Sequence, residues 1–123
     1  MERLIGWIEQ RWPMLTVALL MLITTLSLWP VEQLPQGVPG SDKSHHLIAY
    51  MALVLPLALR QPRYWWWCVA VLFGWSGMIE LIQPYVNRWG EWLDLFANGV
   101  GLLLGCTIGV MLKRYQHSAA KVR

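Results

Sequence analysis

Two short stretches of the sequence place polar side chains at helical spacings. The first holds Asp42, His46 and Tyr50, each four residues from the next, so a helix carries all three on one face. The second holds Asp94 and Asn98, which are also four residues apart. A carboxylate that orients an imidazole is typical of general acid–base catalysis, with Asp42 orienting His46 as the base.

Four further polar residues accompany these stretches. Glu80 and Gln83 lie three residues apart, and Lys43 and Arg88 supply positive charge. In an enzyme, Glu80 or Asp94 would act as the acid, and the two cations would hold a phosphate or carboxylate of the substrate. The candidate catalytic residues are therefore Asp42, His46, Glu80 and Asp94, and the candidate substrate-binding residues are Lys43, Tyr50, Gln83, Arg88 and Asn98.

Most of these residues also have an ordinary structural explanation. Asp42 and Asp94 could cap the positive ends of helices, and Lys43 could anchor a helix end at the membrane surface. Glu80 is harder to explain in this way, because the C-terminal end of a helix is unfavourable for a carboxylate. A metal ion held by the four candidate catalytic residues is a weaker alternative, since their spacing matches no known ligand pattern. The sequence does not identify a cofactor.

Four apolar blocks supply the helices that must carry these side chains. Of the 123 residues, 56% are hydrophobic and 14% are charged, a balance that a water-soluble domain of this length could not bury. The blocks cover about 13–29, 44–59, 64–82 and 93–112, and most approach the roughly 20 residues that cross a bilayer. We therefore predict one all-α domain over residues 1–123, a four-helix transmembrane bundle.

The basic residues predict the orientation of this bundle. Eight of the ten Lys and Arg residues fall on the side that holds both chain ends, and only Lys43 and Arg88 fall on the other. The positive-inside rule makes the crowded side cytoplasmic, so both ends are expected in the cytoplasm. The predicted location is the bacterial cytoplasmic membrane, crossed several times, with the lipid bilayer as partner. A basic tract with interleaved aromatic residues is missing, which argues against nucleic acid.

This topology gathers the candidate site residues near the outer leaflet. A charge at bilayer depth costs at least about 2.5–3.5 kcal/mol on insertion scales, so such residues usually face a partner or a cavity. Chance would scatter them over both leaflets, whereas they share one. We therefore expect a shared polar site at the outer end of the bundle.

Glycines at regular spacing indicate close packing of helices. Gly101, Gly105 and Gly109 repeat every four residues along the last block, and Gly74 and Gly77 could have the same role in the third. Packing within the bundle is the favoured use of the longer stripe. Formation of a homo-oligomer through it is the alternative.

The polar stretches also resemble a known family. The run DKSHHLIAY resembles the DK-x-x-H-x-x-x-Y motif of the VanZ-like membrane proteins. The family's second stretch, E-x-x-Q, a loop arginine and D-x-x-x-N-x-x-G-x-x-x-G, is similar to GMIELIQPYVNRWGEWLDLFANGVGLLLG. The likeness covers about 41–109 and includes all nine candidate site residues. It implies a bacterial envelope context, because the founding member is associated with low-level resistance to the glycopeptide teicoplanin, but it implies no particular reaction.

Two functions from different classes remain open. The first is an enzyme that acts at the outer leaflet on a lipid-linked or cell-wall-related intermediate, through His46 and the surrounding carboxylates. The second is a non-catalytic binding or assembly module, in which the same residues form a structural network. A small proton-coupled exporter is a weaker third option, because the charges lie at one end of the bundle rather than at mid-membrane.

Overall fold

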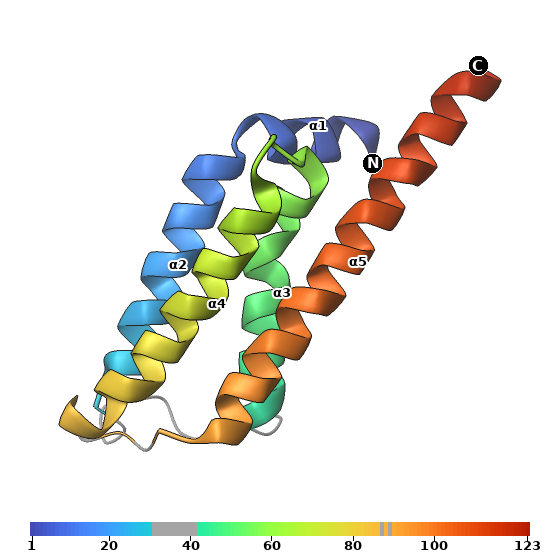
Figure 1. The fold of residues 1–123 in the computed structure, drawn as a ribbon. Helices are drawn as coiled ribbons and strands as arrows, with labels where there is room; N and C mark the ends of the chain where they lie inside the picture. Colours follow the sequence, from blue (N-terminus) through green and yellow to red (C-terminus); the bar gives the residue numbers. More distant parts are fainter. Residues whose placement is uncertain (31–41, 87, 89) are drawn as a thin grey trace.

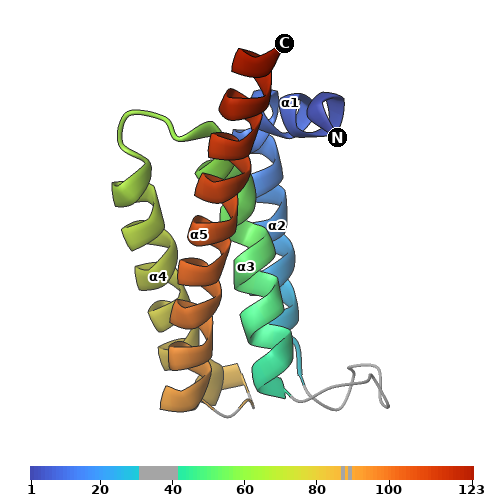
Figure 2. The same ribbon diagram turned by 90° about the vertical axis from the view of Figure 1, so that its right-hand side faces the viewer.

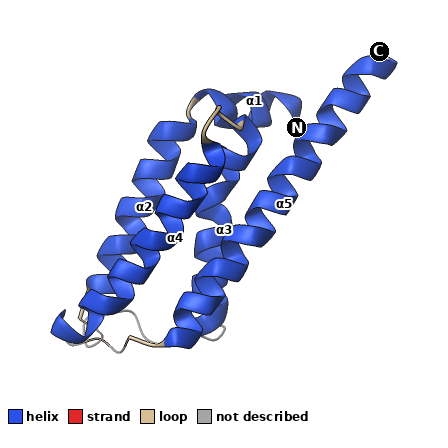
Figure 3. Ribbon diagram, in the orientation of Figure 1, coloured by secondary structure: helices blue, strands red, loops and turns tan. Residues whose placement is uncertain are grey.

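The structure is a computed structural model that describes residues 1–30, 42–86, 88 and 90–123. Within these ranges the chain is helical and contains no strand (Figure 3), as predicted. The elements are α1 (Glu2–Gln10), α2 (Trp12–Leu28), α3 (Asp42–Arg60), α4 (Trp65–Ile82), the short 3₁₀ helix η2 (Gln83–Val86) and α5 (Trp92–Val122).

The four long helices lie side by side and alternate in direction (Figures 1 and 2). Both chain ends, α1 and the α3–α4 connection lie at one end of the bundle. The start of α3, the end of α4 and the start of α5 lie at the other end, which we call the polar end. Because α3 and α5 begin there and run in parallel, the positive ends of both helix dipoles meet at this end.

Helix α3 forms the centre of the bundle. Leu53, Val54 and Leu57 are fully buried on it, and together with Leu72 of α4 and Leu102 of α5 they belong to one hydrophobic core. The other long helices pack around α3, and most of its polar residues lie in its first two turns, at the polar end. On the outer faces of the bundle, large apolar side chains of α2, α4 and α5 are exposed.

Two helices, Trp65–Val86 and Trp92–Val122, are long and apolar enough to cross a membrane. A third candidate is the pair α1–α2, which is bent by 77° at its junction. Alone, α2 has 17 residues and falls short, while α3 does not pass the same test. The described residues therefore support two or three spans by length and composition, and the predicted four crossings stay a prediction.

The helix bounds follow the apolar blocks closely, with two departures. Helix α1 lies outside the predicted blocks; it is amphipathic and turns sharply into α2 where Pro13 occupies the first turn. Helix α5 continues past the expected end near 112 to Val122. Its last turns are polar, so they extend beyond the apolar part of the bundle, as Figure 1 shows.

The long glycine stripe packs against α3 inside the chain. A Cβ atom at Gly101 would overlap the Leu47 carbonyl, and one at Gly105 would overlap the Val54 side chain. All three stripe glycines are buried. The stripe therefore allows α3 and α5 to approach closely, in agreement with the favoured intramolecular use.

Candidate functional site

An ion-pair cluster joins the first turns of α3 and α5 at the polar end. The Nζ atom of Lys43 lies 2.8 Å from Oδ1 of Asp94 and also donates a hydrogen bond to Oε2 of Glu91. Asp94 is only 3% exposed. The hydrogen bonds to Asp94 and Glu91 raise the pKa of Lys43, at the very start of α3, above its ordinary value. Lys43 therefore stays charged at neutral pH and neutralises a buried carboxylate.

His46 lies one turn deeper and is held on both edges of its ring. Its Nδ1 lies 3.0 Å from Oδ1 of Asn98, and its Nε2 lies 3.9 Å from Oδ2 of Asp94. A carbonyl oxygen can only accept, so the contact with Asn98 places the ring hydrogen on Nδ1. Nε2 then carries the lone pair of the uncharged ring, and it faces Asp94. Asn98 is 1% exposed, so its side chain is fixed by packing.

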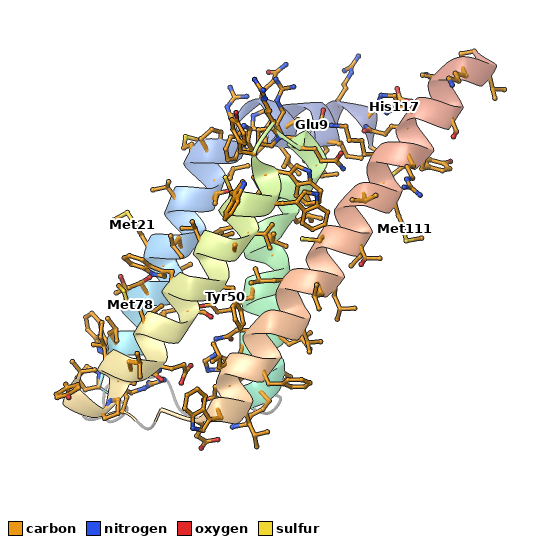
Figure 4. All side chains as sticks on the ribbon, viewed as in Figure 1. Glu9, Met21, Tyr50, Met78, Met111 and His117 are labelled. Carbon is orange, nitrogen blue, oxygen red and sulfur yellow. The ribbon has the colours of Figure 1, made fainter. Side chains whose placement is uncertain are left out.

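Tyr50 connects this cluster to α4. Figure 4 shows Tyr50 inside the bundle, whereas Met21 and Met111 point outward. Its hydroxyl makes a side-chain hydrogen bond with Ser76, whose own hydroxyl donates to the Phe73 carbonyl at 2.7 Å. The Glu80 carboxylate is close enough to interact electrostatically with Tyr50. Tyr50 of α3, the helix that carries His46, thus contacts α4.

Glu80 holds the α4–α5 connection against the end of α4. Its Oε2 accepts a hydrogen bond of 3.2 Å from the backbone N–H of Glu91. At Gly90, a Cβ atom would lie 2.5 Å from the Glu80 carbonyl oxygen, so only glycine allows this close approach. The carboxylate at an unfavourable helix end therefore has a structural partner in the next segment.

Gln83 and Arg88 donate hydrogen bonds to the backbone at the end of α2. Nε2 of Gln83 donates to the Ser27 carbonyl at 3.1 Å, and Nη1 of Arg88 donates to the Trp29 carbonyl at 3.2 Å. The last carbonyls of a helix have no partner within it, so these donors complete the C-terminal end of α2. Both side chains therefore bond the backbone at the end of α2.

The structure thus brings four of the nine predicted residues, Lys43, His46, Asp94 and Asn98, into direct contact. Tyr50 and Glu80 border this group. Asp42 begins α3, but its side chain lies outside the described residues, so its expected contact with His46 does too. Among the described side chains, no three His, Cys, Asp or Glu residues gather closely enough to hold a metal ion.

Sequence reasoning missed three contributors to this site. Glu91 shares the ammonium of Lys43, Ser76 binds the Tyr50 hydroxyl, and Gly90 permits the approach to Glu80. Glu91 could have been recognised, because it lies three residues before Asp94 at the start of a helix, where carboxylates are favoured. Ser76 carries no comparable signal, since a serine within an apolar helix ordinarily bonds its own backbone.

Comparison with known proteins identifies the family but no close relative. No curated protein and no solved structure matches the chain. The family model described as VanZ/LLP1 matches residues 8–113, a range that contains every candidate site residue. Because this match covers most of the 123 residues, the chain belongs to the VanZ/LLP1 family.

Proposed function

We propose that this protein crosses the bacterial cytoplasmic membrane four times, with both ends in the cytoplasm, and acts on a lipid-linked cell-envelope intermediate at the outer leaflet. The observation that carries the proposal is the arrangement of His46 between Asn98 and Asp94 at the polar end. Membership of the VanZ/LLP1 family supports the envelope context. Exposed apolar side chains on α2, α4 and α5 support burial of these helices in lipid.

His46 would act as a general base through Nε2. Asn98 fixes the ring and places the hydrogen on Nδ1, so the lone pair on Nε2 would take a proton from a hydroxyl group of the substrate or from water. Asp94, 3.9 Å away, would stabilise the imidazolium ion that forms. Lys43 keeps Asp94 neutralised while the imidazole is uncharged. The head group would therefore meet a base whose orientation is set before it binds.

A structural network is the second candidate function, and one observation favours it. The described residues bond one another across the two helices, because Lys43 binds two carboxylates and Asn98 contacts His46. In this alternative, the cluster fixes the parallel register of α3 and α5, and the protein binds or assembles without catalysis. Removing one partner of a buried charge pair is then chiefly destabilising.

The substitution His46→Gln separates the two candidates. Glutamine retains hydrogen-bonding capacity and removes the nitrogen that takes up a proton. His45→Gln is the matched control, because His45 is the adjacent histidine and is exposed. The readouts are thermal unfolding of the purified protein, the teicoplanin susceptibility of cells that express each variant, and the lipid-linked precursors in their membranes.

The catalytic proposal expects His46→Gln to abolish the cellular effects while the unfolding temperature stays close to that of the control. Full activity of a correctly inserted His46→Gln protein would refute it. The structural alternative expects a lowered unfolding temperature with activity reduced in proportion. It also expects the exchanged pair Lys43→Glu with Asp94→Lys to recover part of the stability that either single change removes.

A further inference from the structure

Helix α1 lies across the end of the bundle that holds both chain ends (Figures 1 and 2). It is bent by 77° from α2, the next helix in the chain, and it packs chiefly against α3. Helix α2 runs beside α4 and α5, the two helices that qualify individually as membrane spans. A helix at such an angle to the spans lies close to the plane of the membrane, at one of its two surfaces.

The bundle covers only part of the apolar face of α1. Ile5 is buried, and Ile8 is half-buried. Leu4 and Trp7, by contrast, are 61% and 45% exposed. An amphipathic helix with leucine and tryptophan along an uncovered edge is typical of helices that lie in the interface between lipid and water.

The charges of α1 are separated around the helix. Arg3, Trp7 and Arg11 follow one another at intervals of four residues and so share one edge, which we call the free edge. The Cζ atom of Arg11 lies 5.0 Å from the centre of the Trp7 ring, a cation–π contact. Glu2 and Glu9 are seven residues apart and share a different face. The free edge therefore carries two positive charges and no carboxylate.

The carboxylates at this end of the bundle do not neutralise the free edge. None of the ion pairs among the described residues joins Arg3 or Arg11 to a carboxylate. Glu2 instead pairs with Arg123, with 3.4 Å between Oε2 and Nη1. This end carries eight Lys and Arg side chains against two carboxylate side chains, those of Glu2 and Glu9. Charge complementarity therefore favours an anionic occupant.

The free edge matches the head-group layer of an anionic bilayer in three respects. Guanidinium groups bind phosphates through paired N–H donors. Tryptophan prefers the depth of the head groups, and the exposed Leu4 adds apolar area beside the Trp7 ring. An acidic soluble partner would match the charge alone, because it would approach from water and leave this apolar area without a matching environment.

We propose that α1 lies in the head-group layer of the inner leaflet and that its free edge binds anionic phospholipids, with Arg3 and Arg11 on phosphate groups. The two arginines are separated by eight residues, about 12 Å along the helix, so each contacts a separate lipid. This surface lies at the opposite end of the bundle from the His46 cluster. The inference goes beyond the proposed function and rests on it only for the identity of the leaflet.

The test is photolabelling of the full-length protein in lipid nanodiscs that contain phosphatidylglycerol and phosphatidylcholine in equal amounts. A diazirine is placed at the same acyl position of one lipid or of the other, and the ratio of the two labelling yields on α1 measures the preference for the anionic lipid. Arg3→Gln and Arg11→Gln each remove one charge from the free edge. Circular dichroism and thermal unfolding show whether each variant is folded.

Arg123→Gln is the matched control. It removes the same charge at the same end of the bundle, but from a guanidinium that already has a carboxylate partner. Arg11→Lys is the graded variant, because lysine retains the charge and loses the planar set of donors that binds phosphate.

The proposal expects α1 to be labelled more strongly by phosphatidylglycerol than by phosphatidylcholine. Arg3→Gln or Arg11→Gln lowers the ratio by about fivefold, the effect of one cation near an anionic membrane surface, and the double variant lowers it by about twenty-fivefold. Arg123→Gln changes the ratio by less than about twofold. Arg11→Lys gives a smaller loss than Arg11→Gln.

Equal labelling of wild-type α1 by the two lipids would overturn the proposal, as would an unchanged ratio in the folded double variant. An equal fall in Arg123→Gln would also refute it, because the preference would then come from the total charge of this end. Cross-links from α1 to another protein chain, without lipid labels, would assign the free edge to a protein partner instead.

Failure of this proposal is distinguishable from failure of the proposed function. If His46→Gln abolishes the cellular effects while the labelling ratio ignores Arg3→Gln and Arg11→Gln, only the lipid surface is wrong. If the ratio responds as expected while His46→Gln retains full activity, the lipid surface stands and the catalytic role is removed.

Discussion

Replacing Asn98 with alanine removes an acceptor that is 1% exposed and lies 3.0 Å from Nδ1 of His46. The His46 N–H would lose its partner in a half-buried position, where an unsatisfied donor costs about 1–3 kcal/mol. We therefore expect Asn98→Ala to lower the free energy of unfolding by this amount. Thr107→Ala is the control on the same helix, because its exposed hydroxyl bonds only the Leu103 carbonyl, and its effect should stay within about 0.5 kcal/mol.

A double-mutant cycle isolates the interaction between the two side chains. Unfolding by denaturant in a fixed detergent is measured for Asn98→Ala, His46→Ala, the double variant and the wild type, with tryptophan fluorescence as the signal. If the hydrogen bond is the source of the loss, the two changes couple by about 1 kcal/mol or more. Additive effects would refute the reasoning, because Asn98 would then stabilise the protein through packing alone.

Three further predictions concern the frame of the site. Gly105→Ala should destabilise the protein by about 1–3 kcal/mol, because the added Cβ has no room against α3. Gly74→Ala should instead stabilise the protein by up to about 1 kcal/mol, because a Cβ there meets nothing within 4 Å. Equal effects of the two substitutions in thermal unfolding would contradict this difference in packing. The pKa of Lys43 is raised above the free value of 10.5, so its contribution to stability is complete below that value and is lost only as pH rises through the higher native pKa. The stability difference between wild type and Lys43→Met should therefore stay constant from about pH 7 to pH 9, and a decline within that range would oppose the ion-pair account. Trp75→Phe removes a hydrogen bond of 2.9 Å to the Thr24 hydroxyl and should cost about 0.5–1.5 kcal/mol, with a non-additive effect when combined with Thr24→Val.

The helices were largely predictable because their apolar blocks are long and are interrupted by prolines and charges. Helix α1 was missed, since an amphipathic segment of nine residues beside an apolar block does not stand out in composition. The polar residues in the first half of α3 made its membrane span harder to predict. They made the second span the least secure from sequence, and the same residues exclude α3 from the spans that length and composition support.

The membership of the site was easier to predict than its pairing. Helical spacing correctly places Asp94 and Asn98 on one face of α5, but spacing within a helix cannot show which residue faces it from another helix. The register of α3 against α5 determines which residues of the two helices face each other. Gly101 packs on Leu47, the residue after His46, and this contact sets Asn98, one turn earlier, against the imidazole. The orienting role that the sequence assigns to Asp42 stays a prediction, because the side chain of Asp42 lies outside the described residues.

The roles expected for the cations illustrate the same limit. Lys43 and Arg88 were expected to hold an anionic group together, and in the structure each already has acceptors within the protein. Arg88 bonds the end of α2, a partner that is 59 residues away in the sequence and carries no motif. Contacts to backbone carbonyls depend on tertiary packing, so residue type alone does not reveal them.

The hydrogen position on His46 is the most direct test of the proposed base. Nitrogen-15 NMR of histidine-labelled protein in lipid nanodiscs reports it, with His45→Gln and His117→Gln to assign the signals. The account predicts that the uncharged His46 ring carries its hydrogen on Nδ1 and that Asn98→Ala abolishes this preference. A hydrogen on Nε2 in the wild type, or a signal that ignores Asn98→Ala, would contradict the orientation on which the catalytic proposal depends.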